Sequence, residues 1–145
     1  MAHAENSVTI GRPVKIVYDF VLNGANSPLW RPSVTDVSLQ PGKALGAGAV
    51  FKQGLTGPGG RRIDGDYQIV EAKPESSIRF QVIAGPARPE GRYTFEPDGK
   101  ATKISFALDF KPKGLAKLID GMITESMQEE VGMLSNLKEF LESHT

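Results

Sequence analysis

The side chains that could do chemistry in this chain are few, and their distribution excludes most catalytic classes. There is no cysteine, and the only histidines, His3 and His144, lie near the two ends. Ser-His-Asp and Cys-His catalysis both need an internal base of that kind, so neither is expected. Only oxygen ligands remain for a metal ion, and no calcium-loop spacing is present. We therefore expect no metal site and no cofactor.

Asp64 and Asp66 are the one carboxylate pair whose spacing would permit acid–base catalysis. Two residues apart on one strand, they point to the same face, with Cα atoms about 6.5 Å apart. They share that face with Arg62 and Gln68, opposite the apolar side of the strand. A solvated face with charge pairing between strands is the favoured interpretation. We assign no catalytic residue.

Three polar side chains fall instead on the apolar side of their strands, namely Gln53, Tyr67 and Tyr93. A buried tyrosine usually finds a hydrogen-bond partner within the protein, which is one interpretation. The other is that these groups orient the polar end of a ligand, since binding pockets are mostly apolar with a few placed polar groups. A tyrosine acting as a general acid would need its pKa moved far from about 10.

The glycine-rich segment 57–62 has the composition of a phosphate-binding loop but lacks its other features. No Lys-Ser/Thr pair follows the glycines, and no helix is expected after them. A hairpin turn is the favoured interpretation. Its arginines, Arg61 and Arg62, could still lie at the rim of a cavity and meet an acidic head group.

The elements that must position these side chains are mostly strands. Their apolar and polar residues alternate, and short turns containing Gly and Pro separate them, which favours antiparallel neighbours. The candidate strands are Ser7–Ile10, Thr35–Leu39, Ala49–Leu55, Ile63–Glu71, Ser77–Ala84, Arg92–Glu96 and Thr102–Phe110. The alternation gives the sheet one apolar side, which another element must cover.

Two short helices are expected between the first two strands. Pro13 suits the first turn of a helix with an apolar face, which Asn23-Gly24 ends. Ser27 is the expected N-cap of a single further turn that carries Trp30. Trp30 either anchors these helices to the core or forms a wall of a ligand pocket, and the two roles are compatible.

A long helix over Gly114–Ser143 is expected to cover the apolar side of the sheet. Its apolar stripe comprises Leu115, Leu118, Ile119, Met122, Ile123, Met127, Val131, Leu134, Leu137 and Leu141. The acidic residues, Glu130 among them, fall mostly on the opposite side of this helix. Gly121 and Gly132 are weak points at which it can bend. The methionines suit either a plain core or an adaptable pocket wall.

The length and composition of the chain limit the number of domains and the class of protein. A chain of 145 residues with 39% hydrophobic residues corresponds to one domain, 1–145, with a real core. The formal net charge is zero, whereas nucleic-acid binders usually carry a basic excess. No apolar run approaches the roughly 18 residues of a membrane span. Without cysteine there are no disulfides, and a cytoplasmic location is expected.

Several short motifs, in this order and spacing, resemble one superfamily along nearly the whole chain. They are Ser7-Val8-Thr9-Ile10, Arg12-Pro13-Val14, Val17-Tyr18-Asp19-Phe20, the run 26–34 around Trp30, Tyr67-Gln68-Ile69-Val70-Glu71, Gly85-Pro86, and Thr102 before the long helix. The chain is similar to the START-like superfamily (SRPBCC, helix-grip fold), and within it to the polyketide cyclase/dehydrase-like branch.

The resemblance implies an α+β fold with a seven-stranded antiparallel sheet wrapped around a long C-terminal helix, and two short helices after strand 1. It also implies a cavity between sheet and helix. Members of the superfamily bind lipids, sterols, polyketides, hormones or other hydrophobic ligands, and only some are enzymes. No catalytic motif of a subfamily is present in this sequence to carry over.

The expected function is binding of a small hydrophobic or amphipathic ligand, such as a lipid or polyketide, in that cavity. The alternative is a polyketide cyclase or dehydratase that uses the same cavity, and a partner-protein module is a third possibility. The expected ligand-binding residues are Trp30, Phe51, Gln53, Tyr67, Phe80, Tyr93, Phe106, Met122 and Met127.

Overall fold

The computed structural model describes residues 2–42, 44–85, 87–111 and 120–144, with the backbone alone for Pro58 and residues 120–123. The strands are β1 (Ala2–Ile10), β2 (Val34–Leu39), β3 (Val50–Thr56), β4 (Arg62–Asp64), β5 (Tyr67–Lys73), β6 (Ser77–Val82), β7 (Glu90–Asp98) and β8 (Ala101–Phe110). The helices are α1 (Val14–Leu22), α2 (Asp120–Gly132) and α3 (Leu134–Ser143), with the 3₁₀ turns η1 (Gly24–Leu29) and η2 (Pro58–Gly60).

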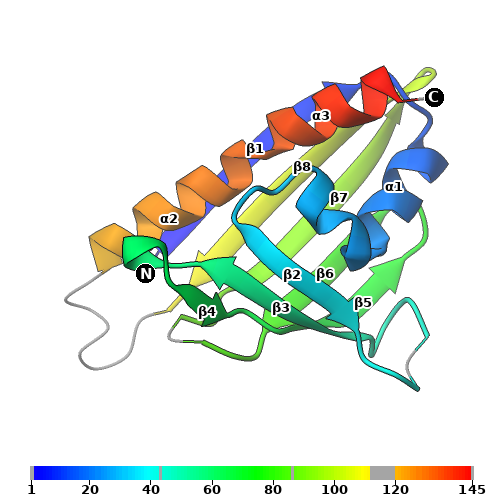
Figure 1. Cartoon of the computed structure of the whole chain (residues 1–145). Coiled ribbons are helices and arrows are strands. Elements are labelled where there is room, and N and C mark those ends of the chain that lie inside the picture. The colour runs from blue at the N-terminus through cyan, green and yellow to red at the C-terminus, as the bar shows by residue number, and fades with distance from the viewer. Residues whose placement is uncertain (1, 43, 86, 112–119, 145) are drawn as a thin grey trace.

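The strands form one curled antiparallel sheet in the order β1-β8-β7-β6-β5-β3-β2 (Figure 1). The consecutive strands β5, β6, β7 and β8 pair in turn, and β1 forms one edge of the sheet beside β8. These seven strands confirm the predicted count, because the short strand β4 lies off this path and pairs only with β3. The predicted α+β helix-grip architecture is therefore the observed one.

The predicted strand Ile63–Glu71 is interrupted, which sequence periodicity did not show. Strand β4 pairs with the second half of β3 and β5 with the first half, leaving Gly65 and Asp66 between them. The amide of Gly65 donates to the carbonyl of Gln53 over 2.8 Å, and the Asp66 carboxylate accepts from the Gln53 amide over 3.0 Å. A side chain thus replaces a strand carbonyl at the break.

Strand β1 is longer than the predicted Ser7–Ile10. It pairs with β8 along its whole length, from Ala2 opposite Phe110 to Ile10 opposite Thr102. The added residues include Ala2 and Ala4, which are buried. Ala and Asn have low strand propensity, so the partner strand determines this start rather than the local sequence.

The segment after β1 forms the two short helices that were predicted. Helix α1 follows Pro13 and buries Val17 and Tyr18, and η1 comes directly after it. The cap of η1 differs from the prediction, because the side chain of Asn23 accepts from the amide of Ala25 over 3.2 Å. Ser27 lies inside η1 and is buried, so its hydroxyl can form a hydrogen bond with a group in the protein interior.

The predicted C-terminal helix is described from Asp120 onward, and Leu115, Leu118 and Ile119 lie outside the described residues. Helices α2 and α3 are separated at Met133, next to the predicted weak point Gly132. The predicted stripe is buried, comprising Met127, Val131, Leu134, Leu137 and Leu141. Figure 1 shows α2 and α3 in line along the sheet, with β1 beside them.

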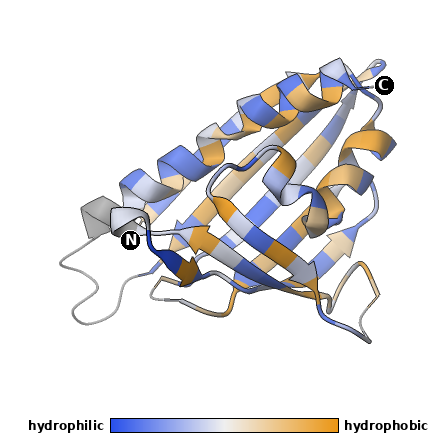
Figure 2. Ribbon diagram, viewed as in Figure 1, coloured by the Kyte–Doolittle hydropathy of each residue, from blue (hydrophilic) through white to orange (hydrophobic). Residues whose placement is uncertain are grey.

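The core lies between this helical layer and the apolar face of the sheet. Along the strands of Figure 2, hydrophobic and hydrophilic positions alternate, as the predicted period of two requires. On β8, Ile104, Phe106 and Leu108 are buried, and Tyr18 from α1 meets Phe95 of β7 edge to face with ring centroids 5.0 Å apart. In the described part of the chain, no helix has the length and apolarity needed to cross a membrane.

Candidate ligand-binding cavity

A cavity of about 330 Å³ lies between the apolar face of the sheet, η1 and α2. Seven of the nine predicted binding residues line it: Trp30, Gln53, Tyr67, Phe80, Tyr93, Phe106 and Met127. Phe51 does not, because it is fully buried behind Tyr67, with the two rings stacked at 5.1 Å. Met122 lies in α2, but its side chain is outside the described part of the structure.

The wall of the cavity is largely a connected set of aromatic rings carried by neighbouring strands. Phe80 of β6 packs against Tyr67 of β5 at 5.5 Å and Tyr93 of β7 at 5.8 Å. Tyr93 in turn stacks on Phe106 of β8 at 4.4 Å. These residues face the same side because each occupies an inward position of its strand. The result is a rigid apolar surface suited to a flat or extended hydrophobic molecule.

Trp30 is both an anchor and part of the wall. It is buried, and its ring meets that of Tyr93 edge to face at 6.5 Å. Its carbonyl accepts a hydrogen bond of 3.2 Å from the side chain of Asn136 on α3. Its amide donates to the carbonyl of Ser27, at the end of η1, over 3.1 Å. These contacts tie η1 and α3 together beside the cavity.

The most polar part of the cavity is an ion pair that the sequence interpretation missed. Arg31 follows Trp30, and its Nε donates to the carboxylate of Glu130 on α2 over 2.5 Å, while Nη2 also contacts Glu130. Nη1 of Arg31 donates to the side-chain oxygen of Gln53 over 3.2 Å, and the Ser33 hydroxyl donates to Glu130 over 3.0 Å. The Arg31 and Glu130 side chains are only 10% and 19% exposed.

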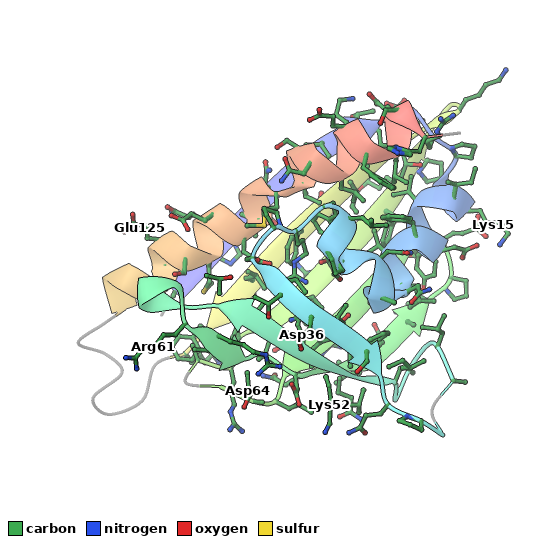
Figure 3. All side chains as sticks on the ribbon, viewed as in Figure 1. Lys15, Asp36, Lys52, Arg61, Asp64 and Glu125 are labelled. Carbon is green, nitrogen blue, oxygen red and sulfur yellow. The ribbon has the colours of Figure 1, made fainter. Side chains whose placement is uncertain are left out.

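This arrangement corrects the prediction that Glu130 lies on the solvated side of the last helix. Glu130 is three residues beyond Met127, so both side chains share one helix face and line the cavity. Figure 3 shows Glu125 on the outer side of α2, where the acidic residues were expected. In the sequence, the position of Glu130 within the apolar stripe indicated that its side chain faces inward. For Arg31, the only such indication was its place next to Trp30.

Two tyrosine hydroxyls complete the polar group. Tyr67 and the buried Ser27 share a side-chain hydrogen bond, and burial raises the pKa of Tyr67 to about 12 despite the opposing effect of Arg31. Burial likewise raises the pKa of Tyr93, again against the nearby charge of Arg31. Both hydroxyls are therefore neutral at physiological pH and can donate hydrogen bonds. We call Arg31, Gln53, Tyr67, Tyr93 and Glu130 the polar cluster.

The charge of Arg31 persists in spite of its burial. Desolvation alone would lower the pKa of this guanidinium. The carboxylate of Glu130 opposes that effect through its charge and its hydrogen bond, and the pKa is raised. The polar cluster therefore contains one positive and one negative charge in direct contact.

The carboxylates Asp64 and Asp66 do not form an acid–base pair. Asp64 accepts from Nη1 of Arg62 over 2.8 Å, and Arg62 also holds Asp36 of β2, both on the exposed face. Hydrogen bonds from Arg62 and Thr35 lower the pKa of Asp36 to about 2. Asp66 instead accepts from the backbone of Gln53. The charge pairing between strands that was predicted for this face thus joins Arg62 to Asp36, whereas Asp64 pairs within its own strand and Asp66 takes no part.

Two exposed residues, Asp64 of β4 and Ser126 of α2, contribute to the lining of the cavity. Ala87 and Pro89, in the loop between β6 and β7, line it as well. Segment 57–62 is the turn between β3 and β4, as predicted, with η2 at its centre. Its Arg61 projects away from the sheet into solvent, as does Lys52 on the same side (Figure 3).

Comparison with known proteins agrees with the fold. The family model described as polyketide cyclase / dehydrase and lipid transport matches residues 1–142. The chain belongs to this family. A search of curated proteins found no match.

Solved structures show the same fold at low identity. A protein of Thermus thermophilus is 21% identical, with a TM-score of 0.77 over 94% of each chain. A START superfamily protein from Mycobacterium smegmatis is 12% identical, with a TM-score of 0.71 over 97% of this chain and 99% of that one. The di-domain ARO/CYC StfQ from the steffimycin biosynthetic pathway is 17% identical, with a TM-score of 0.75 over 98% of this chain and 51% of that one.

Proposed function

We propose that this protein binds a small hydrophobic or amphipathic molecule, with its apolar part against the aromatic wall and its polar end at the polar cluster. The observation that carries the proposal is the 330 Å³ cavity itself, which combines four aromatic side chains from adjacent strands with a buried Arg31–Glu130 pair. Mostly apolar pockets with a few converging polar groups are the usual form of small-molecule sites. The family description, which includes lipid transport, supports the same function.

In this proposal residues 1–145 act as one domain, and seven of the predicted binding residues contact the ligand. Phe51 supports the site from behind Tyr67 rather than touching the ligand. Met122 remains a predicted contact, and the cytoplasmic location remains a prediction. Affinity would come from apolar area removed from water, at about 25 cal/mol per Å² before the cost of association.

The single tryptophan of the chain provides a direct test, because Trp30 lines the cavity. The neutral fluorescent probe N-phenylnaphthylamine should bind with a rise in its own emission and with energy transfer from Trp30. Native mass spectrometry of protein purified from its own host should show a stoichiometric hydrophobic adduct. Absence of probe binding, together with an empty protein in the mass spectrum, would contradict the proposal.

A matched pair of variants places the bound probe in the structure. Ser126 is an exposed residue of α2 that lines the cavity, so the larger side chain of Ser126→Phe should obstruct ligand binding without disturbing the core. We expect the probe affinity to fall at least tenfold, equivalent to about 1.4 kcal/mol. Ser135→Phe, at an exposed serine of α3 away from the cavity, is the control and should leave probe binding unchanged. Equal effects of the two variants would place the probe elsewhere.

A polyketide cyclase or dehydratase activity is the second candidate, favoured by the contact of Arg31 with Glu130 and Gln53 inside the cavity. A ligand carbonyl hydrogen-bonded by Arg31 or Tyr93 would be polarised, and the walls would hold a folded chain near its reacting geometry. Incubation with a synthetic poly-β-ketone distinguishes the two functions. An enzyme should change the rate or the product ratio, and Arg31→Lys should abolish that change. Carriage alone should leave both as they are without protein.

A further inference from the structure

The balance of charge in the cavity indicates which kind of polar end the ligand carries. Among the described residues that line the cavity, only Arg31, Asp64 and Glu130 carry charge at neutral pH. Asp64 is exposed and paired with Arg62. Among these described residues, the buried part therefore holds one guanidinium and one carboxylate in direct contact, and their charges sum to zero. Within this described lining, a charged ligand end would have no unpaired counter-charge.

The charges of the polar cluster cancel, but some of its hydrogen-bond donors have no partner among the described residues. The Tyr93 side chain is buried, with the residue 7% exposed, and its hydroxyl makes no hydrogen bond to any residue in the described ranges. Arg31 has five N–H groups, two on each terminal nitrogen. Since each terminal nitrogen makes one contact, with Glu130 or with Gln53, at least two N–H groups lack a partner among the described residues. Several donors are left without a partner, whereas each carboxylate and amide oxygen of the cluster already accepts at least one hydrogen bond.

The acceptors are engaged by specific contacts. Both oxygens of Glu130 are held, one by Arg31 and the other by the hydroxyl of Ser33. The side-chain oxygen of Gln53 accepts from Arg31, and its amide nitrogen donates to the carbonyl of Gly65 over 3.1 Å. A ligand that enters this site meets free donors beside a neutralised charge, and buried donors without partners are costly.

We propose that the ligand presents an uncharged oxygen acceptor, a ketone or related carbonyl, to Tyr93 and Arg31, and that the cavity discriminates against carboxylates and ammonium groups. This inference rests on the proposed function and names its ligand class. A carboxylate would lie beside Glu130 with only the shared charge of Arg31 to stabilise it, and an ammonium would lie beside Arg31. In a cavity of low dielectric constant both are strongly unfavourable, whereas a carbonyl only accepts hydrogen bonds.

The test uses competitors that share a chain length and differ in their end group. Decyl methyl ketone, dodecanoate, dodecylammonium and dodecane are each titrated against bound N-phenylnaphthylamine at neutral pH. We expect the ketone to displace the probe at a concentration at least tenfold lower than either ion. Dodecane measures the contribution of the alkyl chain alone. This control is needed because any apolar cavity disfavours ions, even without a specific site.

Two variants separate the specific effect from that general one. Glu130→Gln removes the negative charge but keeps the shape, so the affinity for dodecanoate should rise at least tenfold relative to the affinity for the ketone. Glu129→Gln, which removes a neighbouring exposed carboxylate of the same helix, should change neither. Tyr93→Phe should weaken the ketone about tenfold and leave dodecane unchanged.

The outcomes distinguish this inference from the proposed function. Wild-type protein that binds dodecanoate as tightly as the ketone, or a Glu130→Gln variant that leaves dodecanoate binding unchanged relative to ketone binding, would overturn the neutral-acceptor inference while the cavity still binds its probe. If Glu130→Gln does not fold, equal effects of Tyr93→Phe on ketone and hydrocarbon would overturn it instead. A wild-type protein that binds neither probe nor competitor would overturn the proposed function itself.

Discussion

Arg31 and Glu130 are 99 residues apart in the sequence, yet the guanidinium of one donates to the carboxylate of the other over 2.5 Å. One residue follows η1 and the other lies on α2, so the contact joins the layer of short helices to the C-terminal helix across the cavity. Among the described residues that line the cavity, these two are the only buried charged ones, and they are in direct contact. The contact therefore bears on both stability and ligand choice.

Breaking this pair from one side should be costly. Glu130→Ala leaves the guanidinium of Arg31 buried without its counter-charge, so we expect the free energy of unfolding to fall by about 3 kcal/mol. The double variant Arg31→Met with Glu130→Leu removes both charges and should recover most of that loss, because apolar side chains often replace a buried pair without penalty. Urea denaturation of the two single variants and the double variant measures the coupling.

The control for that cycle is the exposed pair between Lys15 and Asp19 on α1. Both side chains are largely in solvent, so Lys15→Ala should change stability little. A Glu130→Ala variant no less stable than this control would contradict the structural importance of the buried pair.

The two tyrosines of the polar cluster should respond differently to loss of the hydroxyl. The Tyr67 hydroxyl is hydrogen-bonded to Ser27, so Tyr67→Phe should lower the free energy of unfolding by about 1 kcal/mol. The Tyr93 hydroxyl has no partner within the described residues, so Tyr93→Phe should leave stability unchanged or slightly raised. Thermal unfolding of the ligand-free variants compares them, and the opposite order would refute this assignment of partners.

Gly24 should tolerate no side chain, because Tyr67 lies directly against it. A Cβ on Gly24 would come within 3.0 Å of two ring atoms of Phe51 and still closer to the Tyr67 hydroxyl. We expect Gly24→Ala to cost about 1–3 kcal/mol of stability and to weaken probe binding, since Tyr67 must move within a packed wall.

Gly132 on α2 offers the matched control for this substitution. A Cβ there meets nothing within 4 Å, so Gly132→Ala should be neutral or stabilise by about 0.4–1 kcal/mol. Both changes add one methyl group, and chemical denaturation compares them directly. A greater loss at Gly132 than at Gly24 would contradict the packing described around Tyr67.

The tyrosines should also determine how the protein responds to alkali. Burial raises the pKa of Tyr18, Tyr67 and Tyr93, which are all the tyrosines of the chain, and that of Tyr67 reaches about 12. The folded state therefore retains protons that the unfolded state releases above the reference pKa of about 10. Stability should be complete below that pH and decrease as the pH rises from there towards the folded values.

Spectrophotometric titration checks this expectation. The absorbance of tyrosinate should appear late and together with the loss of the far-ultraviolet circular dichroism signal, rather than in a separate step near the reference pKa. A normal titration of all three tyrosines in a folded protein would show that the wall is open to solvent.

Much of the fold could be predicted from the sequence because its signals are local. Alternation and turn residues are properties of neighbouring positions, and they were enough to predict seven antiparallel strands and the order of helices. The break between β4 and β5 was not local in this sense, since it depends on Asp66 reaching the backbone of Gln53 on another strand. The early start of β1 likewise depends on its pairing with β8.

The residues of the candidate site likewise fall into those that local sequence patterns predict and those that depend on distant contacts. Inward-facing aromatic residues such as Phe80 and Phe106 could be selected by strand parity alone. Glu130 could not, because a carboxylate within an apolar helical stripe is read as solvent-exposed until a partner is known. That partner, Arg31, comes from a distant part of the chain, and only the folded arrangement brings the two together.

The interruption at Met133 gives the two C-terminal helices separate tasks. Helix α3 carries Leu134 and Leu137, which are completely buried, and holds Trp30 through Asn136. Helix α2 carries Ser126 and Glu130, which face the cavity. Substitutions at the cavity-facing positions of α2 should therefore alter what the cavity accepts, while the buried leucines of α3 continue to hold the helix in the core. The fold thus places the residues that face the ligand and the residues that anchor the helix one after the other along the same stretch of chain.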